Sequence, residues 1–169
     1  MTIQVIVHNT VKKFKIPSRK KFQTWADVVF STFAKKIKKN ISEICIAIVD
    51  KKQSQKLNKT YRKKNKPTNV LSFSYHSISG VMSKSLGDIA ICAEVVQEEA
   101  LLQNKKLESH FAHLTIHGIL HLLNYDHENL KDAKKMEALE IKFLKKLGFS
   151  NPYINPPSRN RERVRVRVR

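Results

Sequence analysis

Three histidines in one short stretch have the spacing of a metal site. His117 and His121 are four residues apart, so on an α-helix their imidazoles lie on the same face, one turn from each other. His127 follows after Asn124, a residue type that tolerates the left-handed conformation in which helices end and the chain turns back. The third imidazole can therefore return to the first two. Three protein ligands with an open fourth position are typical of a catalytic zinc site, whereas structural zinc sites are closed by four.

The same spacing allows two other interpretations. The histidines can instead be buried groups of an apolar helix that are satisfied by hydrogen bonds. The pattern H-x3-H-x5-H also occurs in the metzincin peptidases, whose signature is H-E-x-x-H-x-x-G-x-x-H. Here Gly118 occupies the position of the glutamate that activates water in those enzymes. The metal geometry therefore fits the sequence, but the peptidase reaction lacks its proton acceptor.

Other polar groups lie near this stretch. His113 precedes His117 by one turn, and His110 lies near the same face. We interpret these two as partners of the ligands or as cleft-wall residues rather than as substitute ligands. Asp126 can orient a ligand imidazole or take part in proton transfer, and an ordinary turn carboxylate is an equally good interpretation.

The helix predicted over residues 109–124 has no charged residue except histidine. Its apolar residues lie all around the helix rather than along one stripe: Phe111, Leu114, Ile116, Ile119, Leu120, Leu122 and Leu123. A helix that is apolar on all sides is buried. We therefore expect it to be the central helix of the fold.

Composition and charge restrict the classes of protein. The 169 residues suit one domain, and 41% hydrophobic residues exclude a disordered chain. The balance of 33 basic to 14 acidic residues gives a net charge of +19, which indicates a polyanionic partner, with nucleic acid as the first expectation. No apolar run reaches the ~20 residues that span a bilayer, and the N-terminus lacks a signal-peptide pattern. Cys45 and Cys92 are expected to be buried thiols of a cytoplasmic protein.

Hydrophobic periodicity predicts the other elements. Strands are expected at residues 3–7, 44–49, 70–75 and 86–92, the last two antiparallel. Helices are expected at 22–38, 51–64, 94–105 and 130–147. The run of lysines at 35–39 would end the first of these helices. Asp50 is expected to cap the second, with Leu57 and Tyr61 as its buried stripe, and Gly148 to end the last.

The helix expected at 51–64 begins the densest basic patch of the folded region. Between residues 50 and 66 the only acid is Asp50, and the cations are Lys51, Lys52, Lys56, Lys59, Arg62, Lys63, Lys64 and Lys66. A solvated surface is the usual interpretation of a charge run, but the missing acids favour a phosphate-facing role. We expect Lys59, Lys63 and Lys64 to bind RNA beside the metal cleft.

The periodic pattern stops after Pro152. We expect a folded domain over residues 1–154 and a basic, disordered tail over 155–169, in which arginine alternates with valine near the end. The tail is either a polyanion-binding arm or an oddity of expression or reading frame, and the sequence does not decide between them.

Several separate stretches together resemble the bacterial YbeY proteins, metal-dependent endoribonucleases of ribosomal RNA maturation. They span most of residues 44–154: YR at 61–62, KPTNVLSF at 66–73, LGDI at 86–89, HGILHLLNYDH at 117–127, MEALE at 136–140, and LGF at 147–149 with Tyr153. The chain departs from the family pattern at Asn69, where aspartate is usual, and at Asn124, where glycine is usual. The tail lies outside the pattern.

The resemblance implies an α/β (α+β) fold with a single domain, in which a small mixed four-stranded sheet packs with about five helices. It implies one zinc ion per chain, held by His117, His121 and His127, and a contribution to catalysis from Arg62. It also implies a single-strand-specific endoribonuclease of 16S ribosomal RNA 3′-end maturation and ribosome quality control. Its partners would be ribosomal RNA, the small ribosomal subunit and ribosome-associated proteins, in the cytoplasm.

The residues themselves allow a compatible chemistry. A zinc ion held by three histidines lowers the pKa of its bound water to ~7 and polarises a phosphoryl oxygen. The planar guanidinium of Arg62 suits the charge that develops on phosphoryl oxygens. The proton acceptor would be the metal hydroxide itself or a base such as Asp126. Two alternatives stay open, a metallopeptidase with a relocated base and a non-catalytic ribosome assembly factor with a structural metal.

Overall fold

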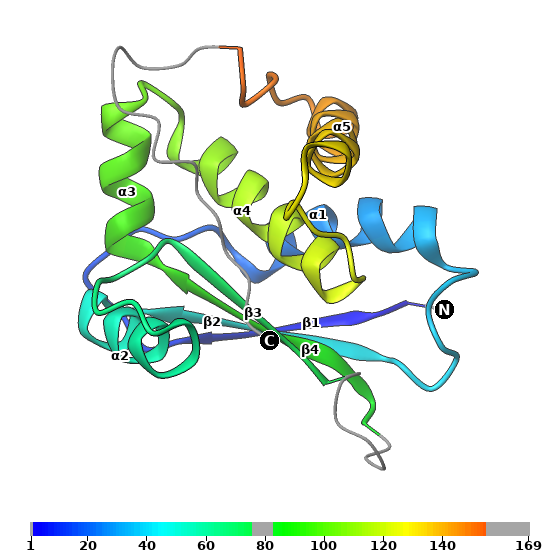
Figure 1. Ribbon diagram of the computed structural model, residues 1–169, viewed down its shortest axis with the longest axis horizontal. Coiled ribbons are helices and arrows are strands. Elements are labelled where there is room, and N and C mark those ends of the chain that lie inside the picture. The colour runs from blue at the N-terminus through cyan, green and yellow to red at the C-terminus, as the bar shows by residue number, and fades with distance from the viewer. Residues whose placement is uncertain (1, 76–82, 155–169) are drawn as a thin grey trace.

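The computed structural model describes residues 2–75 and 83–154 as one α/β domain. A four-stranded sheet packs with five helices in this part of the chain (Figure 1). In chain order the elements are β1 (Gln4–Asn9), α1 (Arg19–Phe33), β2 (Glu43–Val49), α2 (Lys51–Arg62), β3 (Val70–Ser74), β4 (Ser85–Cys92), α3 (Ala93–Leu102), α4 (Leu107–Leu122) and α5 (Leu130–Lys146). The predicted fold class is confirmed.

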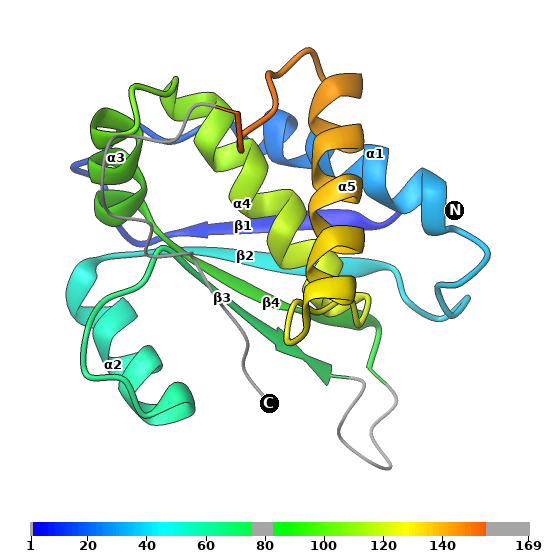
Figure 2. The same ribbon diagram turned by 45° about the horizontal axis from the view of Figure 1, so that its top comes forward.

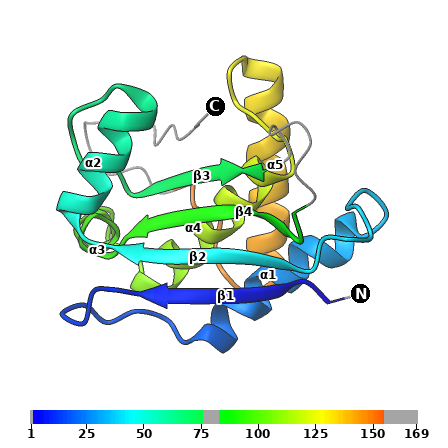
Figure 3. The same cartoon turned by 90° about the horizontal axis from the view of Figure 1, so that it is seen from below.

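The sheet is mixed and has the order β1-β2-β4-β3. The pairs β1–β2 and β2–β4 are parallel, whereas β3 is antiparallel to β4, as predicted. Parallel neighbours need crossover connections, which place helices against the sheet. Helices α1, α3, α4 and α5 cover one face of the sheet (Figure 2), and α2 lies on the opposite face (Figure 3).

Helix α4 lies in the core, as its all-round apolar pattern predicts. Eleven of its sixteen residues are buried. It packs on β3 and β4, and its Phe111 ring meets Phe22 of α1 edge to face, with ring centroids 6.2 Å apart. Contacts on several sides fix the rotation and the axial position of this helix, and therefore the direction of every side chain that it carries.

The predicted chain reversals are confirmed. Asp50 caps α2 in a capping box with Gln53, Asn124 adopts a φ of 65°, and Gly148 adopts a φ of 82° after α5. Cys45 and Cys92 are free thiols, and Cys92 is buried as predicted, whereas Cys45 is only partly buried. None of the helices in the described ranges is both long enough and apolar enough to cross a membrane. The prediction for the tail falls on residues 155–169, which lie outside the described residues.

Helix α1 differs from its prediction at both ends. It begins at Arg19, because the side chain of Ser18 accepts a hydrogen bond from the backbone N–H of Lys21 and caps the helix earlier than the apolar pattern indicates. It ends at Phe33, so the lysines at 35–39 follow the helix instead of ending it, and its last turn carries no basic residue.

The buried stripe predicted for α2 is confirmed only in part. Leu57 is partly buried and packs against the core, but Tyr61 is 51% exposed, and the fully buried residues of the helix are Ser54 and Asn58. The Oγ atom of Ser54 donates to the Thr68 carbonyl at 2.7 Å and accepts from the Thr68 N–H at 2.9 Å. The amide of Asn58 donates to the Lys66 carbonyl at 2.8 Å. Helix α2 is therefore anchored by polar bonds to the segment that follows it.

Helix α3 has a narrow buried face. The helix buries Ala93, Val96 and Ala100 only, and Leu101 and Leu102 face solvent near its end.

Candidate metal centre

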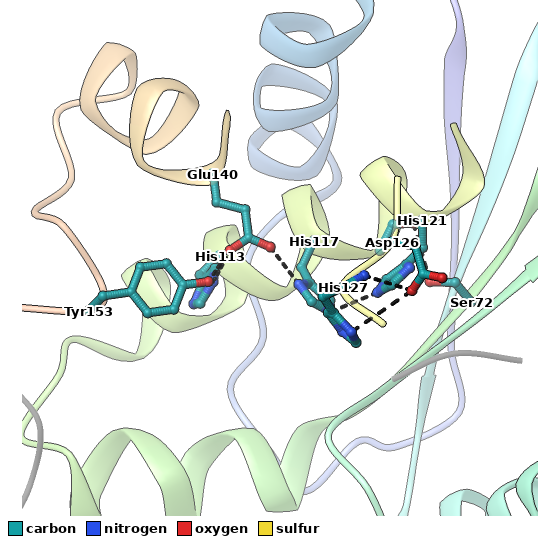
Figure 4. Close-up of polar contacts among 9 residues, drawn as sticks. Ser72, His113, His117, His121, Asp126, His127, Glu140 and Tyr153 are labelled. Carbon is teal, nitrogen blue, oxygen red and sulfur yellow. Dashed lines mark hydrogen bonds and ion pairs between the residues drawn. The ribbon is translucent and has the colours of Figure 1, made fainter. Parts of the chain in front are cut away.

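The three predicted ligands come together at the end of α4. His117 and His121 occupy its last two turns, and their Nε2 atoms are 3.1 Å apart. One candidate ligand atom from each of His117, His121 and His127 lies within 4.8 Å of the others, and Figure 4 shows the imidazoles pointing toward one another. Two nitrogens on one tetrahedral zinc ion are about 3.3 Å apart, given Zn–N bonds of about 2.0–2.1 Å. This donor set therefore fits a zinc ion.

The turn after α4 brings His127 back. The Tyr125 N–H donates to the Leu120 carbonyl at 2.9 Å, and the Asn124 N–H donates to the His121 carbonyl at 3.0 Å. These bonds close the helix end around the left-handed Asn124. Asp126 then accepts a bond from the His127 N–H at 2.7 Å through Oδ1, which lies 3.9 Å from Nδ1 of the same histidine. The sequence located this turn correctly.

The environment of His121 keeps its imidazole neutral. Burial, together with the adjacent His117 and His127, lowers the pKa of His121 to about 2. A neutral imidazole keeps a lone pair on one ring nitrogen, and that lone pair is what a metal ligand needs. His121 is thus prepared for a cation rather than for an anion.

Glu140 is the functional residue that the sequence analysis missed. Its side chain is 1% exposed, and Oε1 accepts a hydrogen bond from Nδ1 of His117 at 2.5 Å. This bond puts the His117 proton on Nδ1, so Nε2 faces His121 with its lone pair. Burial raises the pKa of Glu140, but His117 and His113 outweigh burial and keep the pKa well below its ordinary value. The carboxylate therefore stays ionised.

A signal for Glu140 was present in the sequence. Met136, Glu140 and Phe143 follow one another at the four- and three-residue spacing of a single helix face. A glutamate between two apolar residues on the buried face of an amphipathic helix indicates a buried carboxylate with a partner.

The other carboxylate oxygen of Glu140 binds two more groups. Oε2 receives a hydrogen bond from Nε2 of His113 at 3.1 Å and another from the Tyr153 hydroxyl (Figure 4). Burial and Glu140 both raise the pKa of Tyr153, so its hydroxyl stays a donor. This network fastens the segment after α5 to α4 and α5. His113 is thus a partner of the site, as interpreted from the sequence.

His110 belongs to a separate polar group. Its Nε2 lies 2.7 Å from Glu99 on α3, and the Asn69 amide also donates to Glu99, at 2.9 Å and 3.1 Å. Asn69, which stands where the family pattern has aspartate, is buried and is a donor in this group. The group joins β3, α3 and α4 near the start of α4.

The position of Gly118 argues against a peptidase. Its carbonyl accepts a hydrogen bond from Ser72 on β3 at 3.2 Å. A Cβ atom at this position would lie 3.0 Å from two side-chain atoms of Ile89 and 3.2 Å from Ser72 Oγ. The helix face at residue 118 is therefore filled by the sheet, so the position of the metzincin glutamate has no room for a general base.

The basic residues predicted for the site lie on another helix. Lys59, Lys63 and Lys64 are exposed on or just after α2, and Arg62 is half-buried in its last turn. The ring of Tyr61 packs edge to face on Phe73 of β3, with centroids 5.0 Å apart. Helix α2 thus meets the outer strand β3, and no hydrogen bond links Arg62 to the histidines within the described residues. The roles of these four residues stay predictions.

Burial lowers the pKa of Arg62, although the guanidinium remains charged at neutral pH. Within the described ranges Arg62 has no carboxylate or hydrogen-bond partner. A partly desolvated cation without a structural partner is free to bind an anion from outside the chain.

Comparison with known proteins gives a consistent result. The family model described as Endoribonuclease YbeY matches residues 6–148. Endoribonuclease YbeY from Coxiella burnetii is 46% identical over 151 residues, which cover 89% of this chain and 98% of the relative. Endoribonuclease YbeY from Colwellia psychrerythraea is 46% identical over 140 residues, which cover 83% of this chain and 90% of the relative.

A solved structure supports the fold independently. The solution structure of TM1509 from Thermotoga maritima superposes with a TM-score of 0.53, covers 92% of this chain and 99% of its own, and is 22% identical. At that identity the likeness concerns the fold alone. The match to the family over residues 6–148 and the 46% identity to its curated members agree with the motifs on β3, β4, α4 and α5, and the chain belongs to the Endoribonuclease YbeY family.

Proposed function

We propose that the protein is a metal-dependent endoribonuclease that cuts single-stranded RNA in ribosomal RNA processing, with one zinc ion per chain held by His117, His121 and His127. The observation that carries the proposal is the convergence of three imidazoles, one of them oriented by a buried carboxylate. The assignment to endonucleolytic RNA cleavage follows the description of the relatives.

The chain's own residues divide the work. Bound at this site, zinc would supply a water of pKa ~7 and polarise a phosphoryl oxygen. Glu140 holds the His117 ring with Nε2 toward the centre. Asp126, which lies beside His127 on the same turn, would take the proton. The three histidine side chains would be the metal ligands. Gly118 leaves no room for the general base of a peptidase.

Substrate binding is assigned to α2. Arg62 would place its guanidinium on the oxygens of the scissile phosphate, where planar paired donors stabilise developing charge. Lys59, Lys63 and Lys64 would follow the RNA backbone. The net charge of +19 supports a polyanionic substrate. Within the cell we assign the activity to 16S ribosomal RNA 3′-end maturation and ribosome quality control in the cytoplasm, with the small ribosomal subunit and its associated proteins as partners.

The decisive experiment combines metal analysis with a cleavage assay. The purified protein is expected to contain about one zinc ion per chain, to cut single-stranded ribosomal RNA, and to lose both properties on chelation. His121→Ala should lose metal and cleavage together while keeping its helical circular dichroism. Wild-type cleavage by a His121→Ala protein shown to lack metal would refute the metal-hydrolase assignment. Full metal content without cleavage of any RNA would favour the alternative function, a non-catalytic ribosome assembly factor with a structural metal.

A further inference from the structure

A hollow with a volume of about 410 Å³ lies between the segment that follows α1 and the turn that follows α4. Its lining includes Phe33 from the end of α1, Lys36 and Lys38 from the segment after it, Leu86 from β4, and Leu123 and Tyr125 from the turn. The volume is in the range of small-ligand sites. It is distinct from the histidine cluster, since none of the three histidines lines it.

The hollow combines an aromatic floor with a cationic rim. The rings of Phe33 and Tyr125 are 5.4 Å apart at an angle of 47°, and Tyr125 is only half-buried. The Lys36 ammonium lies 5.6 Å from the centre of the Phe33 ring. Lys36 and Lys38 are exposed, and neither has a carboxylate partner in the part of the chain that the structure describes. The lining residues include no acid.

This combination selects one chemical class of ligand. Single-stranded nucleic acids bind where aromatic or apolar surface accepts a base and neighbouring cations accept the phosphates. An aliphatic ligand would leave the two unneutralised lysines unused, and a free anion would leave the apolar floor unused. A nucleotide uses both. The excess of 33 basic over 14 acidic residues attracts polyanions, and the polyanion of the proposed function is an RNA strand.

We propose that this hollow binds one unpaired nucleotide of the RNA substrate, with its base against Tyr125 and its phosphate on Lys36 and Lys38. The inference rests on the proposed function and adds a subsite to it. The same turn carries the hollow and the metal centre, because Tyr125 is two residues before His127. Two extended residues span at most about 7 Å, so a nucleotide held here sets the register of the strand relative to the three histidines.

The lysine run offers a matched test. Lys36→Gln/Lys38→Gln removes the two cations that line the hollow, whereas Lys35→Gln/Lys39→Gln removes the same charge from exposed neighbours that do not line it. Binding of a fluorescent single-stranded RNA is followed by anisotropy at fixed salt. The first variant should bind about tenfold more weakly and the second should remain within about twofold of wild type. Equal losses in the two variants would overturn the inference.

An abasic strand tests the base separately. An RNA with one abasic nucleotide, moved stepwise along the strand, should lose about tenfold in affinity when the gap occupies the hollow. Tyr125→Leu keeps an apolar side chain beside Phe33 but removes the ring, so its affinity for intact RNA should fall and its abasic penalty should shrink, as coupled partners require. Thermal melting verifies that the variant is folded. An abasic penalty of the same size in wild type and Tyr125→Leu would overturn the assignment of the base.

The failure of this inference can be told apart from failure of the proposed function. Binding is measured by anisotropy and cleavage by gel, on the same metal-loaded protein. If the protein cleaves RNA but the lysine and Tyr125 variants bind RNA like wild type, the subsite is refuted and the proposed function stands. If RNA binding depends on Lys36, Lys38 and Tyr125 but no RNA is cleaved, the proposed function is refuted and the subsite stands.

Discussion

Helices α4 and α2 lie on opposite faces of the sheet and are held in opposite ways (Figures 2 and 3). Helix α4 is buried on several sides and carries two of the three candidate ligands. Helix α2 buries two polar side chains, Ser54 and Asn58, and presents lysines to solvent. Metal ligation needs side chains fixed to a fraction of an ångström, which close packing provides. Binding to a polyanion needs cations exposed to the phosphates, which a helix held by polar bonds at the surface provides.

The largest effect that sharpens this contrast is expected at Arg62, the residue assigned to catalysis on α2. Arg62→Lys keeps the charge but loses the planar pair of donors. We expect kcat to fall by roughly 10²-fold or more, the usual cost of losing one preorganised charge-stabilising donor. Metal content, melting temperature and RNA affinity should stay near wild type. Single-turnover cleavage with saturating enzyme gives the measurement.

A different pattern would move Arg62 to the other side of the comparison. If RNA affinity falls while kcat is unchanged, Arg62 is one more phosphate-binding cation of α2. Lys56→Gln, on the same helix, removes one exposed charge without touching the proposed catalytic group and is the control.

The second effect concerns Glu140, which supports α4 from α5. Glu140→Gln keeps the size of the side chain but removes the charge that three donors share. We expect zinc affinity to fall about 10- to 100-fold, the range for partners that orient a ligand histidine. Competition with a chromophoric chelator measures this without reference to activity. Glu137→Gln is the matched control. Glu137 follows Met136 in α5 but lies outside the helix face that Met136 and Glu140 share, so this variant should bind zinc like wild type.

A positioning role predicts more than a loss of stability. Glu140→Asp should recover part of the zinc affinity, because a carboxylate is restored near His117 Nδ1, even if its melting temperature stays low. If zinc affinity follows melting temperature across Glu140→Gln and Glu140→Asp, the residue serves the fold alone.

The third effect is a pH dependence of the free energy of unfolding that comes from two histidines of α4. Burial lowers the pKa of His121 to about 2 and also lowers the pKa of His113, whereas unfolded histidine titrates near 6.5. Between these values the unfolded chain binds more protons, so the free energy of unfolding of the metal-free protein falls as the pH falls below about 6.5. For His121 the slope approaches about 1.4 kcal/mol per pH unit, and His113 contributes in the same direction.

Urea unfolding of the chelated protein at pH 7, 6 and 5 measures this slope. His121→Asn removes one of the two shifted groups, so its slope should be shallower by the share of one histidine. A slope equal to that of wild type would mean that His121 is protonated in the folded protein. The conclusion that its neutral imidazole is ready to bind a metal ion would then be wrong.

Much of this arrangement was predictable from the sequence, because the relevant signals are local. Caps and turns depend on a few adjacent residues, so Asp50, Asn124 and Gly148 were assigned correctly. The histidine spacing and the all-round apolar pattern of α4 are properties of one helix. Both determine the metal cluster once the turn at Asn124 returns the chain.

The remainder depends on contacts between distant elements. Glu140 reaches His117 only because α5 packs on α4, which no single-helix pattern contains. The stripe predicted at Leu57 and Tyr61 was wrong at Tyr61, because apolar periodicity ignores polar anchors. The Ser54 hydroxyl and the Asn58 amide N–H instead bond to a loop 8 to 14 residues away. The position of Arg62 relative to the histidines is a tertiary property of the same kind.

The fourth effect concerns the exposed lysines on and just after α2. Neutralising Lys59, Lys63 and Lys64 to Gln should reduce the dependence of RNA affinity on salt. Three contacts to a single strand contribute about 2 to the slope of log K against log salt. The loss should be similar for RNAs of different sequence, because phosphate contacts carry no sequence information. Lys12, Lys13 and Lys15, exposed lysines between β1 and α1, are the control triple. An unchanged slope would make α2 an ordinary solvated surface.

The smallest effect tests whether the two helices are independent. Ser54→Ala removes the two-way bond between α2 and Thr68, which leads into β3. We expect the free energy of unfolding to fall by about 1 kcal/mol, the usual net value of such a bond. Zinc affinity should be unchanged, because α4 is held by its own packing on the other face of the sheet. Urea unfolding and chelator competition on the same protein measure both. If zinc affinity falls as well, β3 transmits the disturbance to α4 through Ser72 and Gly118, and the two helices act as one unit.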